Sequence, residues 1–460
     1  MALCCGLAPR AGASATLLLE EPYGKLGFFT ATGHAAVYLS GVCAETPLTL
    51  RRCEPGEIGA VISRYDGVSG YDWVAIPLVP YLYSVDDVSD IPLFADAKTV
   101  AFLRDHYRRA HLEEVAPDRR NGDAPRGNWY ELIGSSYDRT IYGFEIETTS
   151  EQDEALIRKY NSMRNQSRFH TASSNCADFA RDLINFYYPH ALHRSFVSDL
   201  GITTPKQIAK TLVKFGQRHS ELQFARLVIP QVPGSVPRST AVHGVVESFF
   251  KAKKYIVPSA VVSPLFAGCV AAVYIGGGSG RFDPGHDALI LTSDGRLEPP
   301  LKREDRRAYS LQLDHLLAAQ GITASGRNFE KSWGHLQAKS NTEIDENGRP
   351  VLQMHVGQET VNLGIAADNL FGYSASPQLV QQLLEARLHD ELHHTRGAWL
   401  SESEIARDWN LLERAIASAD NESNSLFLNR LTNASIAHSF QTPAVSYALA
   451  RASNSRRNRQ

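Results

Sequence analysis

Several motifs that would assign a function directly are missing from this chain of 460 residues. Its six cysteines include no Cys-x-x-Cys pair, which argues against a structural zinc site. The formal net charge of −3 argues neither for nor against a polyanionic partner. No basic stretch alternates with aromatic residues, so we expect no nucleic-acid partner. The glycine-rich residues 276–280 lack the Gly-Lys-Ser/Thr ending of a phosphate-binding loop. We therefore expect neither a metal nor a cofactor.

One cysteine lies at the start of a predicted helix. Residues 173–175 offer three candidate N-caps before Cys176, and apolar residues then recur at helical spacing until Pro189. The first turn of a helix favours an anion, and with an imidazolium partner the pKa of a thiol falls from about 8.5 to roughly 3.5–7.5. The pattern therefore favours a reactive thiol at Cys176, and the alternative is a buried, inert cysteine.

One histidine lies in a predicted strand. Residues 26–39 are aromatic and β-branched with few charges, and Gly33 beside His34 would let another backbone approach closely. A histidine in such a strand can also be a core residue that hydrogen-bonds a backbone carbonyl. Together with Cys176, however, it supplies the thiol and the base that acyl transfer through a thioester requires.

The order of these two motifs resembles the permuted papain-like thiol enzymes, which include NlpC-type cell-wall peptidases and lecithin–retinol acyltransferase. A G-H-x-x-[VI]-Y-L strand at residues 33–39 precedes an N-C-x-x-F helix start at residues 175–179. Residues 130–144 are similar to the segment before the cysteine helix in an uncharacterised bacterial branch of that superfamily. The resemblance covers residues 22–225.

The resemblance implies a nucleophile, a base and a third polar residue. Cys176 would be the nucleophile and His34 the base. The third residue usually comes from the strand after the histidine strand, where Glu45, Thr49 and Arg51 are candidates. We take Glu45 as the first choice.

The composition, 43% hydrophobic and 21% charged, is typical of a globular protein, and the length allows two or three domains. We expect an α+β fold in which a permuted papain-like domain, an antiparallel sheet with helices, precedes an apolar transmembrane segment and a second α+β region. The expected parts are a signal-peptide remnant over 1–15, the catalytic domain over 16–228, a Pro- and Gly-containing linker over 229–254, the transmembrane segment over 255–275, the C-terminal α+β region over 281–445 and a disordered polar tail over 446–460.

The transmembrane prediction depends on an uncharged run. Residues 255–275 carry no charged side chain, and 21 residues are enough to cross a ~30 Å hydrocarbon core as a helix. The alternative is a buried pair of strands, broken at Pro258 and Pro264.

The prediction of export depends on the first residues. Small residues at 13–15 resemble a signal-peptide cleavage site, which would place the domain in an oxidising compartment. There Cys43 and Cys53 could form a disulfide, provided that their Cα atoms lie within about 7 Å of each other.

From these features we expect a thiol hydrolase, an amidase or peptidase, or else an acyltransferase, at the cell envelope. Its substrate would be a peptide, peptidoglycan, or a lipid amide or ester. One alternative is a non-catalytic envelope binding module of the same fold. Another is a metal enzyme built on His389 and His393, although Glu391 does not hold the position of the glutamate in H-E-x-x-H.

Overall fold

The computed structural model describes most of the chain between residues 13 and 431. The described residues are 13–24, 32–66, 68–166, 169–171, 173–194, 199, 201–251, 253–276, 282–320, 336, 339–356, 358–393 and 399–431. The tail expected over 446–460 and most of the expected leader lie outside them.

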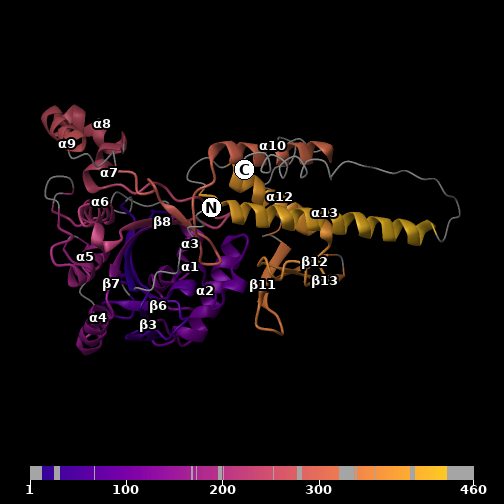
Figure 1. The fold of residues 1–460 in the computed structure, drawn as a ribbon, viewed down its shortest axis with the longest axis horizontal. Coiled ribbons are helices and arrows are strands. Elements are labelled where there is room, and N and C mark those ends of the chain that lie inside the picture. Colours follow the sequence, from indigo (N-terminus) through magenta and orange to yellow (C-terminus); the bar gives the residue numbers. More distant parts are fainter. Residues whose placement is uncertain are drawn as a thin grey trace, which may run out of the picture.

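An eight-stranded sheet, here called the central sheet, forms the core of the part of the molecule on the left of Figure 1. Its order is β10-β9-β8-β7-β1-β2-β5-β6. The bounds are β1 Ala13–Glu20, β2 His34–Leu39, β5 Ala60–Ser63, β6 Val74–Pro77, β7 Ile141–Thr148, β8 Ala225–Ile229, β9 Leu289–Leu291 and β10 Leu297–Glu298. Neighbouring strands run antiparallel except β8 and β9, which are parallel. The sheet is therefore mixed, and the expectation of an antiparallel sheet is corrected.

Helices cover both faces of this sheet. In β1, Leu17 and Leu19 face one side and Leu18 the other, as the two-residue period of a strand requires. On the side of Leu17 and Leu19 lie α4 Ser150–Ser162, α5 Cys176–Tyr187 and α6 Pro205–Gly216. On the opposite side lie α1 Leu78–Tyr83, α2 Ala97–His111 and α3 Ser135–Asp138. Short 3-10 helices occur at η2 Val88–Asp90, η3 Trp129–Leu132 and η4 Ser220–Leu222.

The C-terminal elements pack on the α1–α3 side. They are α10 Arg303–Ala319, β11 Ser340–Ile344, β12 Pro350–Val356, β13 Glu359–Gly364, α12 Pro377–His393 and α13 Glu402–Leu431. One buried hydrophobic cluster contains residues of both parts, for example Leu103 and Leu384. Moreover, β9 and β10 lie within the expected C-terminal region but belong to the central sheet. The sheet thus crosses the boundary that we placed between residues 228 and 281.

The expected transmembrane segment is not a membrane-spanning helix. Residues 253–276 form two shorter helices, α8 Lys253–Val262 and α9 Pro264–Gly276, which follow α7 Val245–Lys251. Among the described residues, no helix combines the length and the hydropathy needed to cross a bilayer. The prediction of a transmembrane anchor is therefore wrong, because the apolar run changes direction at Pro264.

The expected cleavage site lies in the middle of the sheet. Residues 13–15 begin β1, which is paired with β2 on one side and β7 on the other. Cleavage after Ala15 would remove three residues of this central strand.

β3 Val42–Thr46 and β4 Thr49–Arg52 form a hairpin that is a separate two-stranded sheet. A disulfide joins Cys43 to Cys53 across it, with the two Cα atoms 4.9 Å apart. The predicted pairing is confirmed.

Replacing Cys43 and Cys53 by serine should lower the free energy of unfolding. The bridge spans a sequence separation of 10 residues, and restricting the unfolded chain over such a loop is worth about 3 kcal/mol. Equilibrium denaturation of the oxidised protein against the double variant measures the loss. Cys269→Ser, at an exposed free cysteine, is the control and should leave the stability unchanged. Equal stabilities of the oxidised protein and the double variant would contradict this account.

Candidate active site

The helix that carries Cys176 begins with a complete capping box. The Asn175 side chain accepts a hydrogen bond from the Asp178 backbone N–H at 3.0 Å, and the Asp178 carboxylate accepts one from the Asn175 N–H at 3.3 Å. The Asn175 amide also donates to the Thr203 carbonyl at 3.0 Å. These bonds define Cys176 as the first residue of α5, as predicted.

A buried arginine fastens the segment before this helix to the sheet. The Arg64 guanidinium, just after β5, donates to the Ser174 hydroxyl at 3.0 Å and pairs with Asp72 at 2.7 Å. The same group lies over the ring of Phe179, 4.9 Å from its centroid. These contacts hold the start of α5 against β5, which pairs with the histidine strand β2.

The sulfur of Cys176 lies beside the peptide bond that joins His34 to Ala35. The backbone N–H groups of Ala35 and Ala177 are close enough to favour its thiolate. Burial has the larger effect, however, and Glu20 and Glu131 add negative charge nearby, so the pKa of the thiol is raised to about 11. The residue keeps part of its surface exposed. Cys176 is therefore protonated at neutral pH.

His34 is the first residue of β2, and the backbone before it approaches a neighbouring strand closely. Gly33 has φ +71°, and a Cβ atom there would lie 2.1 Å from the Glu20 carbonyl oxygen. Only glycine fits this close approach, which the sequence predicted. In the β1–β2 register Glu20 lies directly opposite His34, so the two side chains share a face of the sheet.

The imidazole of His34 lies in a buried, aromatic environment. It stacks on Tyr65 with ring centroids 4.2 Å apart and an angle of 9° between the planes. Its Nε2 atom is buried and has no hydrogen-bond partner among the described residues. Burial, followed by the positive charge of Arg139, holds the pKa of His34 well below its usual value. The ring is therefore neutral at physiological pH.

A buried ion pair lies next to this imidazole. Arg139 contacts Glu20 at 3.0 Å, and both residues are almost fully buried. The Tyr81 hydroxyl donates to Glu20 and lies 3.4 Å from the Tyr65 hydroxyl. Arg139 also lies 3.7 Å from Glu131 and over the ring of Tyr23. Burial raises the pKa of Glu20, an effect that Arg139 and Tyr81 partly offset.

The electrostatics of the site differ from the sequence-based expectation. A helix start and an imidazolium were expected to lower the pKa of Cys176, but burial raises it, and His34 is itself held neutral. The sequence shows the position of the thiol at a helix start. It does not show that Glu20 and Glu131 lie nearby or how much protein surrounds the sulfur.

Glu45, the expected third residue, does not belong to this site. It lies on the β3–β4 hairpin, exposed, and pairs with Arg51 at 2.6 Å. Arg51 is itself bound through two bonds to Glu57, and Thr49 bonds Thr46 across the hairpin turn. The prediction of Glu45 is wrong because β3 and β4 form a separate hairpin, on which Glu45 is exposed and paired with Arg51.

Sequence reasoning missed Glu20, the carboxyl that does share a face with His34. One signal was available. An acidic residue ends the apolar run 15–19, at the position that pairs with the histidine when the two strands form a hairpin.

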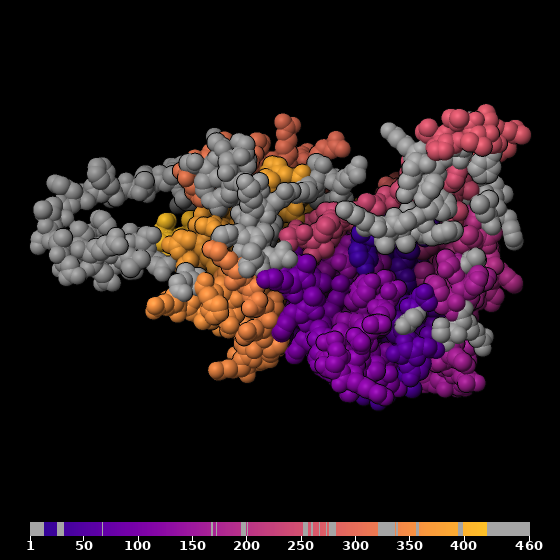
Figure 2. Space-filling view, turned by 180° about the vertical axis from the view of Figure 1, so that it is seen from behind, coloured from indigo at the N-terminus to yellow at the C-terminus, as the bar shows by residue number. Residues whose placement is uncertain are grey.

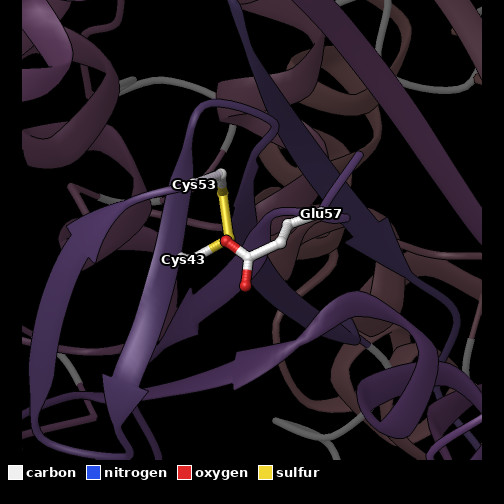
Figure 3. A group of neighbouring side chains, drawn as sticks. All are labelled: Cys43, Cys53 and Glu57. Carbon is white, nitrogen blue, oxygen red and sulfur yellow. A yellow bond between two sulfur atoms is a disulfide. The ribbon is translucent and has the colours of Figure 1, made fainter. Parts of the chain in front are cut away.

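The described residues contain one cluster with the spacing of a metal site, formed by Cys43, Cys53 and Glu57 (Figure 3). The two sulfurs are bonded to each other and therefore offer no thiolate ligand. The rings of His389 and His393 lie with their centroids 4.5 Å apart and their planes tilted by 34°, but within the described part of the chain no third ligand joins them in a cluster.

The best-defined cavity opens next to the buried ion pair rather than at the thiol. It has a volume of about 300 Å³ and lies between the end of the sheet and the C-terminal helices. Its lining includes Glu21 and Thr140, which follow Glu20 and Arg139 in the chain, together with Arg238 and Glu391. Neither Cys176 nor His34 lines it.

Comparisons of this chain with protein-family models, with curated proteins and with solved structures find no match.

Replacing Arg139 by methionine should destabilise the protein at neutral pH. Removing one partner leaves the buried Glu20 carboxylate uncompensated, at a cost of about 3 to 5 kcal/mol. Because protonation relieves that carboxylate, the loss relative to the native chain should shrink as the pH falls. Chemical denaturation at several pH values measures both effects.

Arg139→Met combined with Glu20→Gln is the matched control, since it removes both charges together. It should recover most of the stability that Arg139→Met loses. A double variant no more stable than Arg139→Met would show that the pair contributes through packing and not through charge.

Proposed function

We propose that the protein is a cysteine-dependent amidase or peptidase, or an acyltransferase that uses the same thioester intermediate. The observation that carries the proposal is the position of Cys176 at the capped start of α5, where the backbone N–H groups of Ala35 and Ala177 lie near its sulfur. Cys176 and His34 are 142 positions apart (176 − 34) in the sequence.

The resemblance to the permuted papain-like enzymes stays a prediction. α5 packs on the Ala35 face of β2, whereas the His34 ring lies on the opposite face with Glu20 and Tyr65.

The chemistry would start from a neutral pair. As the sulfur attacks an amide or ester carbonyl and the S–C bond forms, the thiol proton would pass to a ring nitrogen of His34. This transfer requires the ring to leave its stack on Tyr65 and reach the face of β2 on which α5 packs. His34 then returns this proton to the leaving amine or alcohol as its bond to the carbonyl carbon breaks. The Cys176 backbone N–H at the helix start would stabilise the oxyanion. Attack on the thioester by water gives hydrolysis, and attack by an amine gives transfer.

The electrostatics favour a second candidate as well. A thiol with a pKa of about 11 gives little thiolate at neutral pH, and the lowered pKa of His34 leaves no imidazolium to stabilise one. This is the property expected of a non-catalytic module of the same fold, which would bind its ligand without reacting.

The disulfide supports a location outside the cytosol. Cys43 and Cys53 are bonded, and such bonds persist in oxidising compartments. We therefore propose the cell envelope as the protein's location, where a peptide, peptidoglycan, or a lipid amide or ester would be its substrate.

Covalent trapping separates the two candidates. When the full chain is incubated with an activated acyl ester, such as p-nitrophenyl acetate, an acyl adduct should form on Cys176, and peptide mass spectrometry identifies the residue. Cys176→Ala should abolish the adduct. His34→Ala should slow its formation by roughly 10²- to 10⁴-fold, the usual contribution of a general base.

Cys269→Ser, which removes an exposed free thiol, is the control and should leave the rate unchanged. Acylation that persists in Cys176→Ala, or the absence of any adduct on Cys176 with a panel of esters and amides, would reject the enzyme in favour of the binding module.

A further inference from the structure

The helices α7, α8 and α9 project from the body of the protein (Figure 1). In the opposite view they form a protrusion at one corner of the molecule (Figure 2). α7 fastens the group to the body, since the Val245 N–H donates to Asp199 at 2.9 Å and Glu247 is buried. Within the group, Phe250 stacks on Tyr274 with ring centroids 4.6 Å apart. The protrusion is thus an attached, internally packed unit.

Large apolar side chains on this protrusion face solvent. The five most exposed large hydrophobic residues of the described chain all belong to α8 and α9. They are Val257, Val261, Val262, Leu265 and Ile275, with exposed fractions from 58% to 85%. Isolated exposed apolar residues are ordinary, but such a concentration marks a surface that another phase or molecule covers.

The apolar residues of α8 and α9 are not confined to the exposed side. Residues 255–276 include no charged side chain, and Ala267, on the inner side of α9, is apolar as well. A globular partner covers one face of a helix, whereas a helix that is apolar all round suits a hydrocarbon environment. Neither helix is long enough to span a bilayer, as noted above. At 10 and 13 residues they are about 15 to 20 Å long, which corresponds to one leaflet.

Two lysines lie on the helix that neighbours the protrusion. α6 carries Lys210 and Lys214 four residues apart, on one face of the helix. Lys206, one turn earlier, is buried and joins α6 to α7 through Glu247 at 2.7 Å. In the sequence, α8 itself begins with Lys253 and Lys254.

We infer that α8 and α9 insert into one leaflet of an anionic lipid bilayer, with Lys210 and Lys214 towards the headgroups. The exposed apolar side chains of α8 and α9 supply the affinity for the bilayer, and the lysines supply the preference for anionic lipid. This inference is independent of the chemistry proposed for Cys176.

Vesicle co-sedimentation of the full chain tests the inference. The protein should bind vesicles of phosphatidylcholine with phosphatidylglycerol, and bind pure phosphatidylcholine more weakly. Val262→Asp with Leu265→Asp should reduce binding to the anionic vesicles by about tenfold or more, because charged residues are costly in hydrocarbon. Leu311→Asp, at an apolar residue of α10 that is 51% exposed, is the matched control and should bind as the native chain does.

The same variants distinguish lipid from a second copy of the chain. Light scattering without vesicles should give a monomer for both the native chain and Val262→Asp with Leu265→Asp. A native dimer that these substitutions dissociate would overturn the inference and assign the surface to self-association. Failure of the native chain to bind anionic vesicles, or equal binding by the variant, would overturn it too.

Discussion

The buried ion pair between Glu20 and Arg139 is the interaction on which the arrangement of the site depends. It joins the end of β1 to the residue that leads into β7, and Glu20 is also opposite His34 in the β1–β2 pairing. Taking both charges out of water is costly, so a buried pair persists only where further hydrogen bonds complete it. Tyr81 donates such a hydrogen bond to Glu20, and the ring of Tyr23 packs against the Arg139 guanidinium.

The same burial determines the protonation of the reactive groups. Low polarity disfavours any charged form, so the pKa of Cys176 rises and that of His34 falls. The backbone amides near the sulfur lower the pKa of the thiol, but their effect is smaller than that of burial. Both groups are therefore neutral at rest, and any catalysis must move the proton during attack instead of starting from a thiolate–imidazolium pair.

Local features of the fold could be predicted from the sequence, and contacts between distant segments could not. The start of α5 at Cys176 and the need for Gly33 follow from capping chemistry and from the space a glycine leaves. The parallel pairing of β9 with β8 joins segments about 60 residues apart, and no periodicity reveals it. Glu45 was chosen for its place in the sequence, but the hairpin that carries it turns away from the sheet. The uncharged run 255–275 satisfied a hydropathy criterion that ignores the break at Pro264.

The pH dependence of alkylation at Cys176 tests the neutral site most directly. Iodoacetamide labelling of the full chain, quantified at the Cys176 peptide, should be slow near neutrality and should accelerate up to a pH of about 11, following the raised pKa of the thiol. His34→Ala should leave this profile nearly unchanged, because the imidazole carries no charge to stabilise a thiolate. A native rate that already reaches its plateau below a pH of about 8, the range of activated thiols, and that falls in His34→Ala would reveal a preformed ion pair and contradict the account.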